Sequence, residues 1–292
     1  MTAINCKEIR EQILEDVKKE VKDLSGTPKL AIITIGDDDA SKVYVRNKIK
    51  TAEELGIEVT HYQLDGNIDN AEACFRIQYA CADHHAVMLQ LPIPEHLDKD
   101  MLINCIPQHK DVDGLTDLNM GMLVNNREGA IVPATAQGVF EIIKHHVTLK
   151  KYRLNPNDLS GFDVAILNRS QLIGKPLQAL LTNHNATVRL CHSRTNIHDE
   201  MFDEIDYIVL GTGNPKWFDS CFEVQDYHTL IDCSICRDEN GKLCGDLDID
   251  DLLTWREGDF DYTTVPGGVG ILTTACLMKS VVKCYKLNEA IK

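Results

Sequence analysis

Tyr44 and Lys48 lie four residues apart in a segment with helical periodicity, which places a phenol and an amine on one side of a helix. A lysine that loses hydration on burial has its pKa lowered from about 10.4 toward neutrality, and it can then act as an acid–base catalyst. Gln90 follows a predicted strand and precedes Pro92, a position where open α/β sheets contact ligands. Taken alone, these residues are equally consistent with an ordinary helix surface and strand end.

A short acidic segment, Asp111-Val112-Asp113-Gly114, is a second candidate for ligand binding. A buried carboxylate there could hold a ligand edge with several N–H donors, such as a pterin or a guanidine. The other ligands of a calcium loop are missing, so we predict no metal. An ordinary acidic turn is the alternative.

A nucleotide signal lies at Leu167–Pro176, where an apolar strand runs into a polar turn, Gly174 and a helix. Amides at a helix N-terminus bind phosphate, and a glycine lets the backbone approach. The three-glycine dinucleotide pattern is absent, so a purely structural turn is also possible.

The next predicted strand, 187–191, ends in His192-Ser193-Arg194-Thr195, without the carboxylate that usually holds the ribose of NAD. Arg169, Ser193 and Arg194 would suit the extra phosphate of NADP, unless they form only a solvated basic loop. Further along, Pro266-Gly267-Gly268-Val269-Gly270 exposes backbone groups and allows unusual dihedral angles, although a linker would have the same composition.

The elements that must position these residues alternate between strand and helix, which predicts parallel α/β sheets. A loop-rich stretch at 111–138 separates two such patterns and indicates two domains, split near residue 121. The predicted helices are 5–24, 42–55, 71–83, 138–146, 175–183 and 272–287, and the predicted strands are 30–35, 58–64, 86–89, 164–167, 187–191, 207–210 and 229–235.

The composition narrows the classes of function. A net charge of −15 without a basic stripe argues against nucleic-acid binding. No apolar run suits a signal peptide or a membrane helix, and we expect a cytoplasmic protein. The eleven cysteines are scattered, so we expect free thiols, and the lone Cys233-x-x-Cys236 pair indicates no zinc site.

Taken in order, these segments resemble the bifunctional methylenetetrahydrofolate dehydrogenase/cyclohydrolase (FolD) family. The resemblance runs from about residue 41 to 274. It rests on Tyr44 with Lys48, residues 87–95, residues 110–115 with Asn119, Gly121 and Leu123, Arg169-Ser170 with 174–176, residues 186–188 and 191–195, Gly245-Asp246-Leu247, and 266–270.

The resemblance implies two α/β domains with an active-site cleft between them. A folate-side domain would span 1–120, completed by the helix at 272–292, and a Rossmann-type NADP domain would span 121–271. It also implies a cytoplasmic homodimer that acts in one-carbon metabolism and purine biosynthesis. Such an enzyme would oxidise 5,10-methylenetetrahydrofolate with NADP and hydrolyse the methenyl product to 10-formyltetrahydrofolate.

The resemblance also implies a role for each site residue. Lys48 would be the catalytic amine, Gln90 its tuning partner, and Tyr44 the aromatic platform for the folate. Asp113 would anchor the pterin, and the backbone of Pro266, Gly267 and Gly268 would border the folate. The residues expected to bind NADP are Arg169, Ser170, Gly174, Lys175, Pro176, His192, Ser193, Arg194 and Thr195.

Four positions depart from the family pattern. Ala134 and Ala136 stand where the family has Cys and Pro, Asn168 stands where it has glycine, and Ile271 stands where it has proline. Asn tolerates left-handed dihedrals, so Asn168 can preserve the turn. Two other interpretations stay open: a dehydrogenase without cyclohydrolase activity that uses NADP or NAD, and a non-catalytic folate- or nucleotide-binding protein.

Overall fold

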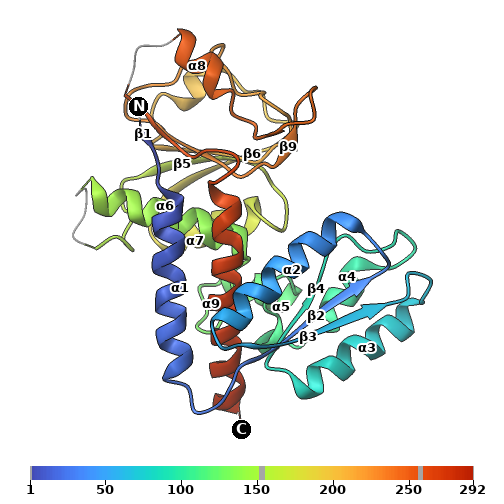
Figure 1. The fold of residues 1–292 in the computed structure, drawn as a ribbon. Helices are drawn as coiled ribbons and strands as arrows, with labels where there is room; N and C mark the ends of the chain where they lie inside the picture. Colours follow the sequence, from blue (N-terminus) through green and yellow to red (C-terminus); the bar gives the residue numbers. More distant parts are fainter. Residues whose placement is uncertain (1, 151–154, 256–258, 292) are drawn as a thin grey trace. The chain divides into compact units, whose positions relative to one another are not determined.

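The computed structural model describes residues 2–150, 155–255 and 259–291 (Figure 1). The chain forms two compact units, which we name by their sheets. The six-strand unit comprises Met1–Glu11 and Thr135–Thr273, and the three-strand unit comprises Gln12–Ala134 and Thr274–Lys292.

The three-strand unit is built on a parallel sheet in the order β3-β2-β4. Its central strand, β2 (Lys29–Ile35), is almost wholly apolar, and the two neighbours are β3 (Glu58–Leu64) and β4 (Ala86–Leu89). Burial on both faces explains why β2 and β4 read as continuous apolar runs rather than as alternating patterns. The helices in this part of the chain are α2 (Asp39–Glu54), α3 (Asn70–Asp83), α4 (Lys99–Asn104) and α5 (Asp117–Val124).

The six-strand unit holds a parallel sheet in the order β1-β11-β8-β7-β5-β6. Its middle strands are apolar and buried, as expected for a sheet covered on both faces. The strands are β1 (Thr2–Ala3), β5 (Asp163–Leu167), β6 (Thr187–Cys191), β7 (Tyr207–Leu210), β8 (Thr229–Asp232) and β11 (Asp261–Tyr262), with β9 (Cys236–Arg237) and β10 (Leu243–Cys244) forming a separate antiparallel pair. The accompanying helices are α6 (Ala134–Leu149), α7 (Gly174–Asn183) and α8 (Ile249–Trp255).

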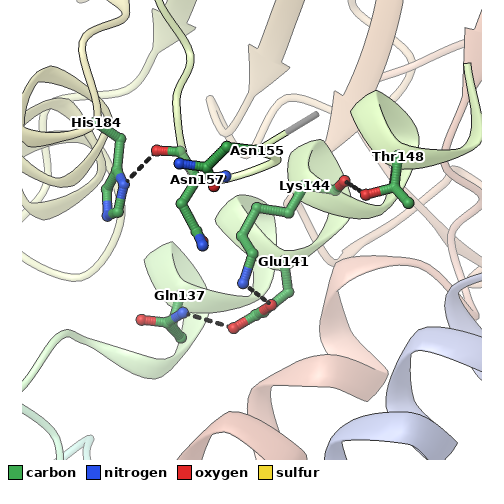
Figure 2. Close-up of polar contacts among 7 residues, drawn as sticks. All are labelled: Gln137, Glu141, Lys144, Thr148, Asn155, Asn157 and His184. Atoms are coloured by element: carbon green, nitrogen blue, oxygen red, sulfur yellow. Dashed lines mark hydrogen bonds and ion pairs between the residues drawn. The ribbon is translucent and has the colours of Figure 1, made fainter. Parts of the chain in front are cut away.

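Helix α6 carries a row of polar side chains at helical spacing (Figure 2). Gln137 Nε2 donates to Glu141 Oε1 over 2.9 Å, and Lys144 Nζ lies 3.1 Å from Glu141 Oε2. Lys144 Nζ also lies 5.4 Å from the centre of the Phe140 ring, which packs against His184 from the end of α7. The row therefore joins α6 to α7 within the six-strand unit.

Two long helices, α1 (Cys6–Lys22) and α9 (Val269–Ile291), contribute residues to both units. In the three-strand unit, Tyr285 of α9 contacts Ser25 through their hydroxyls at 3.1 Å. Asn288 Nδ2 donates to the carbonyls of His85 and His109. The late segment of α9 is therefore part of the packing of the three-strand unit.

The expected α/β fold with parallel sheets is confirmed, and some element boundaries were wrong. The stretch 111–138 is mostly loop, as expected, but it also contains α5 and the start of α6, which were not predicted there. The strand expected at 229–235 ends at Asp232, and α9 begins at Val269, three residues before its expected start. The expected domain limits, 1–120 with 272–292 and 121–271, stay a prediction.

The expectation of free thiols was wrong for Cys74 and Cys105, which form a disulfide with their Cα atoms 5.9 Å apart. The other nine cysteines, all within the described part of the chain, form no disulfide. Among the described residues, no helix is long and apolar enough to cross a membrane, and no three His, Cys, Asp or Glu side chains are grouped so as to hold a metal ion.

Candidate active site

The Lys48 amine and the Gln90 amide meet at the C-terminal end of the three-stranded sheet. Lys48 Nζ donates to Gln90 Oε1 over 2.8 Å and lies 3.9 Å from Met88 Sδ at the end of β4. Gln90 is itself fixed, because its backbone N–H donates to Ile33 O and its Nε2 donates to Leu91 O. The amine is therefore held in one place by an amide that cannot readily move away.

Burial lowers the pKa of Lys48, and the nearby Asp113 carboxyl opposes that change. Burial raises the pKa of Asp113 to about 6, although the positive charge of Lys48 acts in the opposite direction and lowers this pKa. Asp111 raises the pKa of Asp113 further. The structure thus places Lys48, Gln90 and Asp113 in one electrostatically coupled group, in which the lysine and the aspartate both titrate closer to neutrality than usual.

The Asp113 backbone is positioned by a buried polar network around Asn119. Asn119 Nδ2 donates to Asp111 Oδ2 over 2.8 Å and to Gln108 O over 3.1 Å, while Asn119 Oδ1 accepts from Gln108 Nε2 and Ile131 N. Asp111 Oδ2 also accepts from the Thr116 N–H. The sequence showed Asn119 only as one of the residues that carry the family resemblance, and its central place in this network is seen only in the structure.

Replacing Asn119 by alanine should lower the free energy of unfolding by about 2–4 kcal/mol, because buried partners on both sides lose their hydrogen bonds. Urea unfolding followed by circular dichroism measures the change. Asn125→Ala is the matched control: its exposed side chain donates only to Gly121 O one turn back, and the expected cost is about 0.5 kcal/mol or less. Equal losses in the two variants would contradict a special role for the network.

Tyr44 is 52% exposed on α2, on the same side as Lys48, so its ring is available to a ligand. The opposite side of α2 borders a pocket of about 300 Å³ at the ends of β2 and β3. Val45, Ile49, His61 and Gln90 are among its lining residues. Gln90 thus contacts both Lys48 and this pocket.

A second pocket, of about 440 Å³, lies in the six-strand unit after the ends of β5, β6 and β7. Four of the expected cofactor residues line it, namely Arg169, His192, Ser193 and Thr195. The turn after β6 is closed by His192 N–H donating to Thr195 Oγ1 and Arg194 N–H donating to His192 Nδ1. The segment 192–195 carries no carboxylate, as expected from the sequence, so cationic and hydroxyl donors face the pocket.

The turn between β5 and α7 is tight. A Cβ at Gly174 would lie 1.9 Å from Asn168 O, so only glycine fits there. Asn168 Oδ1 accepts the Gly174 N–H, Ser170 O accepts the Lys175 N–H, and Pro176 has no N–H. Ser170 N–H also donates to Asn168 Oδ1. The first amides of α7 are thus bonded within the chain, and Asn168 supplies contacts that sequence reasoning missed.

The fit to a dinucleotide therefore rests on the donors at the pocket rather than on the helix end. Arg169 and Ser193 offer the charge-assisted and hydroxyl contacts that a phosphate requires. Pro266, Gly267 and Gly268 lie between β11 and α9, where Gly267 has φ of 106° and a Cβ at Gly268 would lie 2.4 Å from Thr264 O. Their contact with folate stays a prediction.

In the three-strand unit, Lys48 of α2, with a lowered pKa, lies at the end of a parallel sheet, and in the six-strand unit a second parallel sheet ends in a pocket lined by Arg169 and Ser193. This combination is typical of a two-domain α/β enzyme that uses a dinucleotide. The family model of the tetrahydrofolate dehydrogenase/cyclohydrolase catalytic domain matches residues 4–113, and that of the NAD(P)-binding domain matches residues 133–289. The chain belongs to the tetrahydrofolate dehydrogenase/cyclohydrolase family.

Curated relatives and solved structures agree. The bifunctional protein FolD of Bacillus subtilis is 38% identical over 290 residues, covering 98% of each chain. The crystal structure of the bifunctional FolD enzyme of Campylobacter jejuni is similar with a TM-score of 0.87 and 33% identity, covering 98% of this chain and 99% of that one. The FolD enzyme of Trypanosoma brucei, solved with NADP and an inhibitor, is similar with a TM-score of 0.81 and 26% identity, covering 100% of this chain and 98% of that one.

Proposed function

We propose that this protein oxidises 5,10-methylenetetrahydrofolate with NADP and hydrolyses the resulting 5,10-methenyltetrahydrofolate to 10-formyltetrahydrofolate. The observation that carries the proposal is the Lys48 amine, held 2.8 Å from Gln90, with its pKa lowered by burial and coupled to Asp113. A group with a pKa near the working pH is what the hydrolytic step requires.

The first step needs alignment more than acid–base chemistry. NADP, when bound, accepts the hydride that leaves the bridging carbon between two folate nitrogens. We assign the folate to the three-strand unit, where the exposed Tyr44 ring offers a stacking surface for an aromatic part of the substrate. Asp113, as a carboxylate, accepts hydrogen bonds from the donor edge of the pterin.

The second step needs proton transfers at defined atoms. Water adds to the methenyl carbon, and Lys48 Nζ in its neutral form takes the proton that the water loses. The hydroxyl on that carbon then releases its remaining proton to solvent and becomes the formyl oxygen, while one carbon–nitrogen bond breaks and the Lys48 ammonium returns the first proton to the departing nitrogen. Gln90 Oε1 accepts a hydrogen bond from Nζ and so keeps the amine oriented through both transfers.

We assign NADP to the pocket of the six-strand unit. Arg169 and Ser193 line the pocket and are proposed to hold the 2′-phosphate, together with Arg194, which follows Ser193 but is not among the lining residues. His192 and Thr195 shape the turn beside it. The tight turn after β5 is proposed to support the diphosphate through the shape of its backbone. This turn contains Ser170, Gly174, Lys175 and Pro176.

The wild-type enzyme should prefer NADP over NAD by at least about tenfold in kcat/KM, because the 2′-phosphate gains charge-assisted bonds that NAD lacks. Arg169→Ala should remove most of that preference and leave the NAD reaction nearly unchanged. Steady-state kinetics with each cofactor measure both values. Arg237→Ala, which removes an exposed arginine of β9, is the control and should retain the preference. Equal efficiency of the wild-type enzyme with NAD would contradict the assignment.

One assay separates the proposal from its two alternatives. Absorbance of the methenyl product is followed after mixing with methylenetetrahydrofolate and either NADP or NAD, and its later decay reports hydrolysis. A binding protein gives no product, and a dehydrogenase that lacks the second activity gives product that does not decay faster than in buffer. Retention of both Lys48 and Gln90 in hydrogen-bond contact favours the bifunctional enzyme.

We further propose that the protein acts as a homodimer in the cytoplasm, where 10-formyltetrahydrofolate supplies formyl groups for purine biosynthesis. Nine cysteines among the described residues form no disulfide, which supports a reducing compartment, although Cys74 and Cys105 are paired. The mass of the particle in solution, measured by light scattering, tests the dimer.

A further inference from the structure

Asn168 stands where the family resemblance predicts glycine, and its side chain makes three hydrogen bonds that glycine cannot make. Its Oδ1 accepts from Ser170 N–H over 2.7 Å and from Gly174 N–H over 3.1 Å. Its Nδ2 donates to Gly211 O over 2.5 Å. The first two bonds close the turn 168–174 after β5, and the third joins that turn to the loop 211–213 after β7.

Gly211 is fitted to this side chain. A Cβ built at Gly211 would lie 3.2 Å from Asn168 Cβ and 3.3 Å from Asn168 Nδ2, and its three nearest neighbours are all atoms of Asn168. These distances are shorter than ordinary van der Waals contact. The pair is therefore mutually dependent: the amide occupies the space that a side chain at position 211 would need.

The loop 211–213 is anchored independently of Asn168. Asp246, which is fully buried, accepts from Thr212 N–H over 2.5 Å and from Gly213 N–H over 3.0 Å. Ser234 Oγ also accepts from Gly213 N–H over 3.2 Å. Because the loop is fixed from the other side, the bond from Asn168 ties the turn 168–174 to a rigid support.

Both segments form walls of the cofactor pocket. Asn168 and Arg169 line it from the turn, and Gly211 and Thr212 line it from the loop. Arg169 directly follows Asn168, so the conformation of Asn168 determines where the Arg169 side chain starts. The first amides of α7 already donate to Asn168 and Ser170. The affinity for the cofactor therefore depends on the residues that line the pocket and on how firmly the turn and the loop are held in place.

We propose that Asn168 is a positioning residue for the cofactor: it fastens the turn 168–174 to the loop 211–213, fixes the direction of Arg169, and thereby sets the affinity for NADP. The proposal rests on the assignment of NADP to this pocket. With glycine at position 168, the turn would become ordered only when the cofactor binds. Asn168 instead orders the turn beforehand, so that binding costs less conformational entropy.

The test measures the dissociation constant of NADP by calorimetry in variants of the full chain. Asn168→Gly, which removes all three bonds, should weaken NADP binding about tenfold, as expected for the loss of one to two net hydrogen bonds. Asn168→Asp keeps the size and the acceptor but turns an oxygen toward Gly211 O, so it should weaken binding at least as much. Asn240→Gly, in an exposed turn of the same unit, is the control and should bind NADP as the wild type does.

A double-mutant cycle tests the pairing itself. Gly211→Ala alone should weaken NADP binding several-fold, because its methyl group displaces the Asn168 amide. In the Asn168→Gly background the same alanine has lost its contacts, and it should change the dissociation constant by less than about twofold. Hydrolysis of methenyltetrahydrofolate without cofactor should stay at the wild-type rate in the control Asn240→Gly, and the circular dichroism spectrum should match that of the wild type in all these variants.

The outcomes are distinct. Wild-type affinity in Asn168→Gly, or equal effects of Gly211→Ala in both backgrounds, would overturn the proposal. Tighter binding in Asn168→Gly would also overturn it, by showing that the amide competes with the cofactor for the Gly174 N–H. A parallel loss of methenyl hydrolysis and NADP binding would reduce Asn168 to a general structural residue. Failure of the wild-type protein to bind NADP would instead overturn the cofactor assignment.

Discussion

Lys48→Met is expected to lower the rate of methenyltetrahydrofolate hydrolysis by about 100-fold or more, the range that general acid–base catalysis supplies. Methionine keeps the length and helix propensity of the side chain, so α2 should persist, but the group that transfers the proton is gone. The rate is measured by the decay of methenyl absorbance. Oxidation of methylenetetrahydrofolate should fall less, because that step depends on alignment.

Lys50→Met is the matched control for this variant. Lys50 lies on the same helix with its side chain 75% exposed, and its amine is 3.9 Å from Glu54. Such an exposed ion pair contributes little to folding stability, so the Lys50 variant should hydrolyse the substrate as the wild type does. Hydrolysis by Lys48→Met within about threefold of wild type would remove Lys48 from the proposed role, since general acid–base catalysis supplies far more.

Asp113→Ala should weaken folate binding by about 1.5–3 kcal/mol, which is roughly 10- to 150-fold, through loss of a charge-assisted contact to the pterin. NADP binding should be nearly unchanged. Calorimetry with each ligand measures both affinities. Asp16→Ala, which removes an exposed carboxylate of α1, is the control and should leave both unchanged. Unaltered folate affinity in Asp113→Ala would show that the carboxyl only forms a turn.

The raised pKa of Asp113 gives this prediction a pH dependence. Because burial raises the pKa of this carboxyl to about 6, the carboxylate proposed to hold the pterin is lost as the pH falls through that value. Folate affinity should therefore fall below about pH 6 in the wild type and stay level in Asp113→Asn. A raised acid pKa means that ionisation costs folding stability as the pH rises through 6, so Asp113→Asn should be no less stable than wild type at neutral pH.

The sequence predicted the elements whose residues carry a strong period or a continuous apolar run. Strands β2 and β4 are examples, since both are buried on both faces and bounded by polar or proline-containing segments. Strands β1, β9, β10 and β11 contain two residues each, too few to show any period. Helix α5 was missed because Asp, Asn and Gly dominate its surroundings, while its actual start is fixed by the Thr116 side chain accepting from Asn119 N–H.

The candidate catalytic residues of the site could be named from the sequence, but the residues that hold them in position could not. Lys48 and Gln90 could be paired through the family resemblance, and the structure places them in contact. The network of Asp111 and Asn119, in contrast, joins segments whose closeness depends on the folded loop. Asn168 appeared in the sequence only as a departure from the family pattern, because its contact with Gly211 links residues 43 positions apart.

The order of synthesis gives a consequence of the way each unit draws on distant parts of the chain. Strand β1 at Thr2–Ala3 pairs with β11 at Asp261–Tyr262, so this pairing forms only after residue 262 has been synthesised. The three-strand unit likewise acquires the contacts of Tyr285 and Asn288 only when α9 has been synthesised. Because residues 274–292 follow the whole six-strand unit in the sequence, the three-strand unit completes its packing last, although most of its residues are synthesised first.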